Sequence, residues 1–340
     1  MSKHSTLQFI LKRLLSAIPS VIGVIIVSFI MTRMLPGDPA AFFAGASATP
    51  EAIAQVRETL GLDKSGFEQF FIYISNLVRG DLGTSLTTGQ TVIYDLITRL
   101  PASLELTLAG VFFAFIIAIP LGILAALKPN SWLDHLSRFI STAGVSLPTF
   151  FTGLLLVYIF YFLLGIAPAP VGRLDLLSSP PQHFTGFYLI DSLVSRNFPL
   201  FIIAFQHLIL PAITLGIFAL APLARVTRAS MISILASDFI RMAKSHGLSP
   251  VKILFTYAFR NALLPIITTI GVVFSFLLGA NILVEKVFAW PGVGSYAVEA
   301  LITSDYTPVQ GFVLTMAFLY IFLNLAIDIL YGIIDPRANI

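Results

Sequence analysis

The sequence predicts an all-α integral membrane protein with about six transmembrane helices, on the evidence of its composition and its long runs without charge. Of its 340 residues, 57% are hydrophobic and only 11% are charged, whereas soluble domains carry about 25% charged residues. Its mean hydropathy is +0.92. A charge-free run of about 18 residues or more can cross a hydrocarbon core about 30 Å thick. Six such runs are present: Leu14 to Thr32, Leu106 to Leu127, Phe139 to Gly172, Asn197 to Ala224, Asn261 to Val284 and Tyr306 to Ile327.

The first and third runs need separate interpretation. Lys12 and Arg13 precede the first run, but no small-x-small cleavage site follows it, so we interpret it as a retained anchor and not as a signal peptide. The third run is too long for one span, and its tail, Ile166 to Gly172, is expected to form a loop. Prolines within the runs are expected to kink the helices and leave room for a path between them; these are Pro120, Pro148, Pro211 and Pro265.

The distribution of Lys and Arg predicts a topology with both termini inside. With the N-terminus inside, 12 basic residues fall in inner segments and 8 in outer segments. Five of those 8 lie in the long segment 33–105, which the positive-inside rule weights weakly. We therefore divide the chain into a first segment and helix (1–33), an outer segment with short surface helices (34–105), and a five-helix core (106–340) that includes an inner loop at 225–262.

The long outer segment is expected to contain two short surface helices. Thr49 can cap a helix that begins at Pro50 and stops at Gly61. A second amphipathic helix is expected over Phe67–Val78, where apolar residues recur at helical spacing. Both helices are interpreted as a cover that packs over the bundle, with a substrate-binding role as the alternative. The second outer segment, 173–196, shows no helical period and is expected to be a loop.

The inner loop is expected to form a basic helix-Gly-helix knob that faces the cytosol. Its 36 residues, 225–260, contain six of the 20 basic residues and a single acid, Asp238. Ser237 and Asp238 supply a cap and a negative first turn for a helix that ends at Gly247. A second helix begins at Ser249-Pro250.

Phe239, Met242 and Ala243 fall on one face of the first of these helices, and Arg241 and Lys244 lie outside that stripe. We therefore interpret this segment as a folded knob that points at the cytosol. The alternative is a basic loop that lies on anionic lipid headgroups.

The motifs of several other function classes are missing from the sequence. There is no G-x-x-x-x-G-K-[ST] phosphate loop, no H-E-x-x-H zinc pair and no cysteine, and the five histidines are scattered. Gly45-Ala-Ser47 weakly resembles a membrane serine protease motif but lacks the following glycine. Ionisable residues near the span ends are expected to be solvated or paired, which disfavours an ion-driven carrier; they are Glu105, Glu285, Lys286 and Asp328.

Many short motifs, in order along the chain, resemble the permease subunits of ABC-superfamily peptide importers of the dipeptide and oligopeptide type. The resemblance covers essentially the whole sequence, although Ala338-Asn-Ile340 is a shorter and less basic ending than usual. The motifs are Phe9-Ile-Leu-Lys-Arg-Leu-Leu-Ser-Ala-Ile-Pro19, Leu35-Pro-Gly-Asp-Pro39, Leu60-Gly-Leu-Asp63, Arg79-Gly-Asp-Leu-Gly-Thr-Ser85, Gly144-Val-Ser-Leu-Pro148, Phe288-Ala-Trp-Pro-Gly-Val-Gly294, Asp305-Tyr-Thr-Pro-Val-Gln-Gly311 and Asp335-Pro-Arg337.

The inner loop is similar to this family's cytoplasmic coupling loop, whose general form begins Glu-Ala-Ala and keeps a glycine four residues after the second alanine. Ala243 and Gly247 match that form, whereas Arg241 and Met242 replace its first two positions. The separation of Gly247 from Pro265 also fits the peptide branch. The resemblance implies that Asp238, Phe239, Arg241, Met242, Ala243 and Gly247 dock into a groove on an ATPase subunit.

The resemblance further implies a type I importer permease fold in a bacterial inner membrane and transport by alternating access. The implied partners are a second similar permease, two ATP-binding subunits and an external substrate-binding protein, with no nucleic acid. This chain would carry out no catalysis and hold no cofactor or metal, since ATP and Mg²⁺ would bind the partner subunits. Dipeptides are favoured by the segment Phe184–Asp191, while glutathione-like peptides and nickel complexes stay open. An ion-coupled secondary transporter is the alternative, and a membrane-embedded hydrolase is a third reading.

Overall fold

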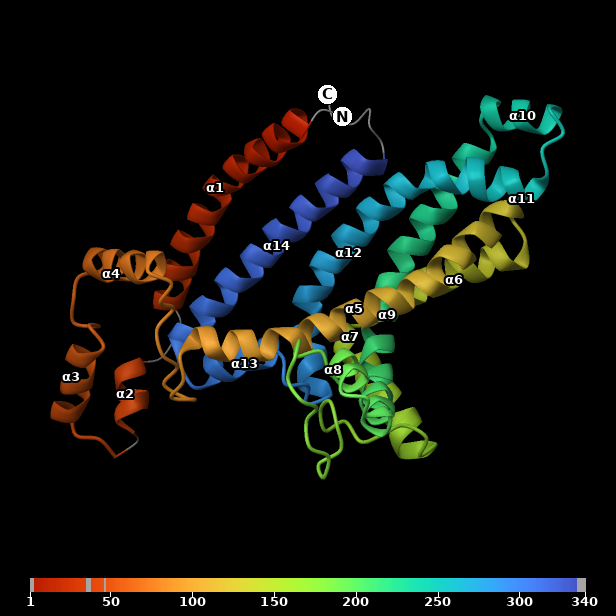
Figure 1. Ribbon diagram of the computed structural model, residues 1–340. Coiled ribbons are helices and arrows are strands. Elements are labelled where there is room, and N and C mark those ends of the chain that lie inside the picture. The colour runs from red at the N-terminus through yellow and green to blue at the C-terminus, as the bar shows by residue number, and fades with distance from the viewer. Residues whose placement is uncertain (1–2, 35–37, 46, 335–340) are drawn as a thin grey trace. The chain divides into compact units, whose positions relative to one another are not determined.

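The computed structural model describes residues 3–34, 38–45 and 47–334, and the regular elements among them are all helices, joined by turns and loops (Figure 1). These described residues form no β-strand, and they contain one isolated antiparallel β-bridge between Thr84 and Thr91. Residues 35–37 of one predicted motif, and all of Asp335-Pro-Arg337, lie outside the described residues. The elements are α1 (Lys3–Met34), α2 (Pro39–Ala44), α3 (Pro50–Thr59), α4 (Gly66–Val78), α5 (Val92–Leu127), α6 (Trp132–Ser146), α7 (Thr149–Leu156), the π-helix η1 (Val157–Leu163), α8 (Tyr188–Val194), α9 (Phe198–Leu235), α10 (Asp238–Ser245), α11 (Pro250–Lys252), the π-helix η2 (Ile253–Phe259), α12 (Arg260–Val287), α13 (Val293–Ile302) and α14 (Tyr306–Ile334).

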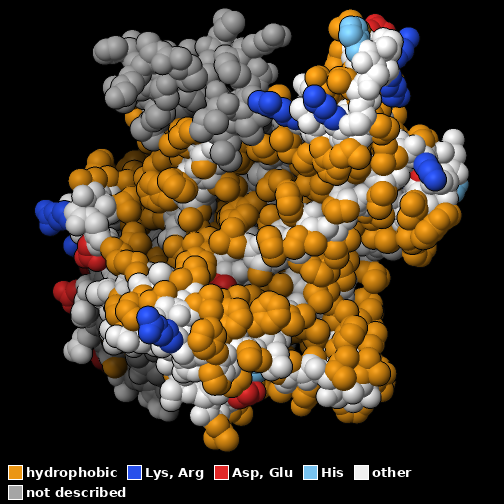
Figure 2. All heavy atoms as spheres, turned by 45° about the vertical axis from the view of Figure 1, so that its right-hand side comes forward, with side chains coloured by type: hydrophobic (Ala, Val, Ile, Leu, Met, Phe, Trp, Pro, Cys, Tyr) orange, Lys and Arg blue, Asp and Glu red, His pale blue; other side chains and the backbone are white. Residues whose placement is uncertain are grey.

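Four helices in the described part of the chain are long and apolar enough to cross a membrane. They are α5, α9, the continuous helix Pro250–Val287 formed by α11, η2 and α12, and Tyr306–Ile329 of α14. The first predicted span lies within α1, and the third corresponds to the shorter apolar helix Thr149–Leu163. Apolar side chains cover most of the face shown in Figure 2, as expected for helices surrounded by lipid.

The third predicted span is broken at Pro148, where only a kink was predicted. α6 ends at Ser146, Leu147 is extended (φ −104°, ψ 139°), and Pro148 precedes the first residue of α7. A proline disfavours the helical conformation of the residue before it, so the chain changes direction here. The other three prolines lie inside their helices as predicted: Pro120 in α5, Pro211 in α9 and Pro265 in α12.

The chain forms two compact units, each with its own core. The first comprises Met1–Pro101 and Pro291–Phe322, and the second comprises Ala102–Trp290 and Leu323–Ile340. In the first unit, the start of α5 packs against α13 through an apolar cluster. Two buried carboxylates fasten this unit: the Tyr296 hydroxyl donates to Asp95 over 2.9 Å, and the Ser85 hydroxyl donates to Asp305 over 2.8 Å.

The two predicted surface helices of the outer segment are present as α3 and α4. Thr49 caps α3 as expected. α4 begins slightly before the predicted residue, because Ser65 and Glu68 form a reciprocal capping box. The Tyr73 ring of α4 stacks on Phe29 of α1 with centroids 5.7 Å apart, so α4 packs on the apolar part of α1.

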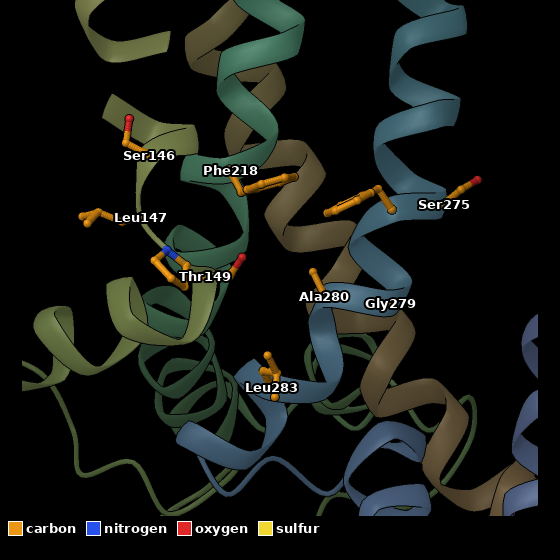
Figure 3. A pocket seen from close by; sticks show the side chains of 10 residues that line it. Ser146, Leu147, Thr149, Phe218, Ser275, Gly279, Ala280 and Leu283 are labelled. Carbon is orange, nitrogen blue, oxygen red and sulfur yellow. The ribbon is translucent and has the colours of Figure 1, made fainter. Parts of the chain in front are cut away.

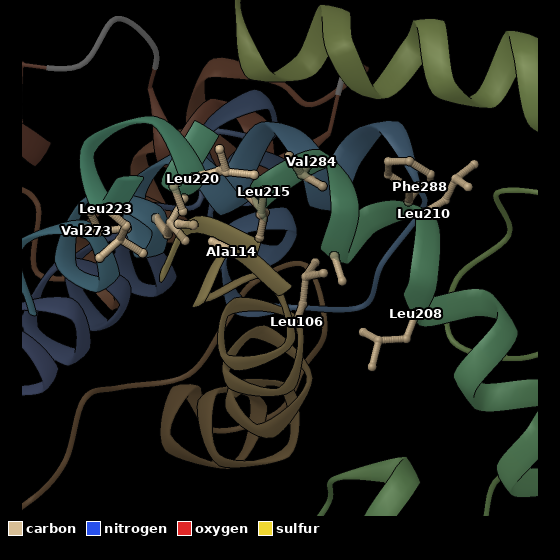
Figure 4. Close-up of a cluster of buried hydrophobic side chains, with 14 of the residues drawn as sticks. Leu106, Ala114, Leu208, Leu210, Leu215, Leu220, Leu223, Val273, Val284 and Phe288 are labelled. Atoms are coloured by element: carbon tan, nitrogen blue, oxygen red, sulfur yellow. The ribbon is translucent and has the colours of Figure 1, made fainter. Parts of the chain in front are cut away.

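The second unit is organised around α5, α9 and α12, which contribute buried side chains to a large apolar cluster (Figure 4) and to a second cluster near α10. Close helix contacts depend on glycine. A Cβ atom on Gly216 of α9 would lie 2.4 Å from the Phe113 ring and 3.0 Å from the carbonyl oxygen of Gly110, both on α5. Small residues let membrane helices approach closely, and dispersion contacts then hold them together.

A buried ion pair joins the loop after η1 to α5. Arg173 donates to a Glu105 carboxylate oxygen over 2.5 Å and to the carbonyl of Gly186 over 2.8 Å. The other Glu105 oxygen accepts the N–H of Leu189 over 2.9 Å, and the Arg173 guanidinium lies 3.4 Å from the Tyr188 ring centroid. Glu105 is therefore paired, which is one of the two states, solvated or paired, predicted from the sequence. The prediction of a loop throughout 173–196 was wrong, because α8 forms within it.

Candidate functional site

Helix α10 is the best-defined candidate site, and it projects at the end of α9 (Figure 1). Its C-terminus closes with a Schellman motif: the N–H of Gly247 donates to Lys244 over 3.0 Å, and that of Leu248 donates to Ala243 over 3.3 Å. Gly247 has φ +73°, the left-handed conformation that glycine supplies without strain. The predicted helix-Gly-helix arrangement is therefore present.

The next helical stretch is also started by residues that the sequence identified. The Ser249 hydroxyl accepts the N–H of Lys252, with Pro250 at the first helical position. Ser237 has the extended backbone of a cap before α10, but its side chain makes no cap bond and instead donates to the carbonyl of Ile234 over 2.5 Å. α10 is thus held at both ends by short-range backbone geometry.

The inner side of α10 is anchored in the second unit. Ile240 is fully buried and Ala243 is 8% exposed, and both belong to an apolar cluster with Met231 of α9 and Ile253 of η2. The predicted stripe included Ala243 but not Ile240. Helical spacing alone did not reveal Ile240, because its burial depends on α9 and η2, which pack from the other side.

The outer side of α10 presents two large apolar side chains. Phe239 is 42% exposed and Met242 is 60% exposed. Arg241 lies beside them, paired with Asp238 over 3.0 Å, and both members of that pair are exposed. Several Lys and Arg side chains are visible at the upper end of Figure 2, where α10 projects. An exposed apolar pair with a charged rim is the usual composition of a protein interface.

A buried carboxylate fixes the part of α9 that leads to α10. Asp134 of α6 is fully buried and accepts Arg228 Nε over 2.5 Å and Arg228 Nη2 over 2.8 Å. Arg138 Nη2 and the N–H of Asn130 donate to the same carboxylate over 2.8 Å and 2.9 Å. These hydrogen bonds, led by those from Arg228, hold the pKa of Asp134 well below its usual range despite its burial. The inner turn before α6 and the end of α9 are thereby tied together.

The described residues contain no cluster of three or more His, Asp or Glu side chains that could hold a metal ion. The structure brings together all six predicted site residues on α10 and its following turn. In this arrangement Phe239 and Met242 are accessible on the outer side of α10, while Ile240 and Ala243 are packed into the second unit.

Sequence models of one transporter family match nearly the whole chain. The model described as "Binding-protein-dependent transport system inner membrane component" matches residues 118–340, and the model of the N-terminal part of such membrane components matches residues 6–107. Together these two matches include every helix from α1 to α14 except for residues 3–5 of α1 and residues 108–117 of α5.

Curated relatives agree over similar lengths. The chain is 44% identical to the "Probable D,D-dipeptide transport system permease protein DdpB" of Escherichia coli (strain K12), with 94% of each chain covered. It is 42% identical to the di/tripeptide transport system permease protein DppB of Pseudomonas aeruginosa, with 98% of this chain and 99% of that one covered. It is 38% identical, at the same coverage, to the glutathione transport system permease protein GsiC of E. coli O6:H1.

The fold is shared with a solved transporter. A chain in a structure of the MetNI methionine ABC transporter in inward-facing conformations matches with a TM-score of 0.53 over 72% of this chain and 97% of that one, at 15% identity. The predicted all-α type I importer fold is confirmed. With 44% identity to a curated permease and family matches across both of its units, this multi-pass membrane protein belongs to the family of inner-membrane components of binding-protein-dependent transport systems.

Proposed function

We propose that this chain is the channel-forming permease subunit of an ATP-driven importer for dipeptides and oligopeptides in a bacterial inner membrane. The cargo assignment is supported by relatives at 40–44% identity whose names specify dipeptide or di/tripeptide transport. The observation that carries the coupling mechanism is α10, which is anchored by Ile240 and Ala243 and presents Phe239 and Met242 outward.

In this proposal α10 is the coupling helix. Phe239 and Met242 enter an apolar groove on an ATP-binding subunit, and Arg241 contacts the rim of that groove. Because Ile240 and Ala243 are packed into the bundle, a displacement of α10 is passed to α9 and η2. Closure of the ATP-binding subunits then biases the permease between inward-open and outward-open states.

The full complex in this proposal contains a second permease, two ATP-binding subunits and an external substrate-binding protein. ATP and Mg²⁺ bind the partner subunits, and this chain carries out no covalent chemistry and holds no cofactor. The absence of a phosphate-binding loop from the sequence supports this division of labour.

The substitution Gly247→Val tests the coupling role. A β-branched residue at φ +73° is strained by about 1–3 kcal/mol, and no heavy atom lies within 4 Å of the position a Cβ would take. The effect therefore comes from the backbone of the α10 turn and not from a clash. We expect normal membrane insertion and normal delivery of substrate to the complex. The amount of peptide taken up per ATP hydrolysed should fall by about 5- to 150-fold. The measurement is peptide uptake and substrate-stimulated ATP hydrolysis of the reconstituted complex.

Gly247→Asn is the matched control, because asparagine tolerates the left-handed conformation better than other residues with a side chain. It should retain most of the coupling. Reversal of the rim charge in Arg241→Glu should have a milder effect than Gly247→Val, since Arg241 is largely exposed. If Gly247→Val transports at the wild-type rate, the loop is a membrane-surface segment and the coupling role is wrong.

Uptake into vesicles that contain the reconstituted complex also tests which energy source drives transport and which cargo is carried. Uptake that requires ATP inside and the binding protein outside supports the importer, whereas uptake under an ion gradient without ATP would indicate a secondary transporter. The named relatives include a glutathione permease, so dipeptides, glutathione and a nickel complex should be compared in one competition assay. We expect dipeptides to compete most strongly.

A further inference from the structure

A cavity of about 690 Å³ lies within the second unit, between the break that separates α6 from α7 and the exposed face of α12 (Figure 3). Ligand pockets for small molecules have volumes of about 300–1,000 Å³. Its walls include Leu147 and Thr149 at the break, Phe218 of α9, and Ser275, Phe276 and Gly279 of α12. Figure 3 shows Leu147 and Thr149 of the break across an open space from Gly279 and Ala280 of α12.

The helix break supplies polar groups that an unbroken helix would not. Leu147 is extended and Pro148 has no N–H, and no side chain caps the start of α7. The first N–H groups of a helix have no partner within it. The Thr149 hydroxyl makes no hydrogen bond to the residues that the structure describes.

The remaining walls are apolar and leave room. The rings of Phe218 and Phe276 are stacked, with centroids 4.9 Å apart and an interplanar angle of 12°. Gly279 is exposed, and a Cβ atom there would meet no heavy atom within 4 Å. None of the residues that line the cavity carries a charged side chain.

A second concavity in the same unit has a different chemistry. This groove of about 830 Å³ is lined by side chains such as Phe112, Phe205 and Ile209. Its one ionisable side chain, Glu105, already accepts hydrogen bonds from Arg173 and Leu189. The groove therefore offers hydrocarbon contacts but few hydrogen bonds, and it suits lipid chains. A peptide backbone carries a donor and an acceptor at almost every residue, so it fits the cavity at the break and not this groove.

We propose that the cavity at the α6–α7 break is this chain's part of the cargo passage, and that it receives the backbone of a short peptide without selecting its side chains. This inference rests on the proposed peptide-import function. Thr149 and the free backbone groups at the break hydrogen-bond to peptide groups, while the Phe218–Phe276 pair contacts apolar parts of the cargo. Because the walls hold no charge, acidic, basic and neutral peptides pass with similar ease.

Cysteine accessibility tests this assignment directly, because the chain has no native cysteine. Thr149→Cys and Gly279→Cys place a thiol in the cavity, and Phe112→Cys places one in the apolar groove as the matched control. The assembled complex in lipid nanodiscs is treated with a charged, membrane-impermeant methanethiosulfonate reagent, with and without ATP. A thiol in a watery passage should react more than about tenfold faster than one facing lipid, because only the thiolate is reactive and an apolar environment disfavours it.

The expected result is that positions 149 and 279 react in at least one nucleotide state, that their rates change with ATP, and that saturating dipeptide slows them. If both positions react as slowly as position 112 in every state, the cavity is not the passage. Wild-type uptake in proteoliposomes is measured in parallel. Peptide uptake together with unreactive cavity positions would overturn only the passage, whereas absence of peptide uptake would overturn the proposed function.

A size test gives a second, independent readout. Gly279→Leu should fit without a clash inside this chain and should narrow the cavity, so uptake of tetrapeptides should fall several-fold more than uptake of dipeptides. Val272→Leu is the control, since Val272 is exposed on α12 but does not line the cavity. Equal losses for both peptide lengths in Gly279→Leu would contradict the assignment.

Discussion

At the scale of single residues, two buried carboxylates in the second unit are supplied with specific partners. Asp134 receives hydrogen bonds from Arg138, Arg228 and Asn130, and Glu105 receives them from Arg173 and Leu189. A charge moved away from water is tolerated only when such bonds replace its hydration. The Asp134 network connects the turn at 128–131 to α9. Since α10 directly follows α9, the network also restrains the helix that leads to α10.

Removal of the Asp134 charge should therefore cost stability. Asp134→Asn leaves Arg228 without a counter-charge, and we expect a loss of about 2–4 kcal/mol, measured as a lower apparent unfolding temperature in detergent. Hydrogen bonds lower the pKa of Asp134 in the folded state, so its contribution is complete above the unfolded value of about 3.9 and declines as the pH falls below that value. The difference between wild type and Asp134→Asn should accordingly be full at neutral pH and shrink in acid.

Arg138→Ala is the control for this prediction, because Arg138 is half-exposed and its share of the pair is screened by water. It should cost no more than about 1 kcal/mol. If Asp134→Asn unfolds at the same temperature as wild type at neutral pH, or if its loss of stability does not change with pH, the Asp134 charge does not stabilise the fold.

At the scale of elements, the sequence predicted helices that depend on local signals and missed those that depend on neighbours. Thr49 and Gly247 mark helix ends through caps and positive φ, and these ends were predicted correctly. α8 was missed because its position depends on Asp191, which accepts backbone N–H groups from Thr185 and Gly186, a contact without a periodic pattern. The two π-helical segments and the burial of Ile240 likewise arise from packing between elements.

Packing between α5 and α9 should be sensitive to a single methyl group. The Cβ of Gly216→Ala would lie 3.0 Å from the Gly110 carbonyl oxygen, a backbone atom that cannot rotate away, and 2.4 Å from the Phe113 ring. We expect overpacking to cost about 1–3 kcal/mol and to lower the apparent unfolding temperature.

Gly23→Ala in α1 is the matched variant, since a Cβ there meets no heavy atom within 4 Å. Alanine is favoured over glycine in a helix by about 1 kcal/mol, so this change should leave the protein as stable or make it slightly more stable. Equal behaviour of the two variants would mean that α5 and α9 are not in close contact.

At the scale of the whole molecule, composition and charge distribution were sufficient to predict an all-helical membrane protein, but not to fix the number of crossings. Four described helices meet the length and hydropathy expected of a span, α1 is also long enough at 32 residues, and Thr149–Leu163 is shorter. Short spans are accommodated by local thinning of the bilayer or by flanking residues that reach the interface. Sequence alone could not resolve this because the break at Pro148 shortens a run that is continuous in composition.

The two possible topologies differ at only some positions, which makes the number of crossings testable. If all six apolar helices cross, Lys64 is outside and Lys128 is inside. If α1 and Thr149–Leu163 do not cross, Lys64 is inside and Lys128 is outside. His183 is outside and Lys252 is inside in both cases, so they serve as controls. All four side chains are exposed, and the chain has no cysteine to interfere.

We expect Lys64→Cys and His183→Cys to react with an impermeant thiol reagent in intact cells. Lys128→Cys and Lys252→Cys should react only after permeabilisation, because the positive-inside rule favours basic residues on the cytoplasmic side. Labelling of Lys128→Cys in intact cells, with Lys64→Cys protected, would reduce the bundle to four crossings while leaving α10 on the cytoplasmic side.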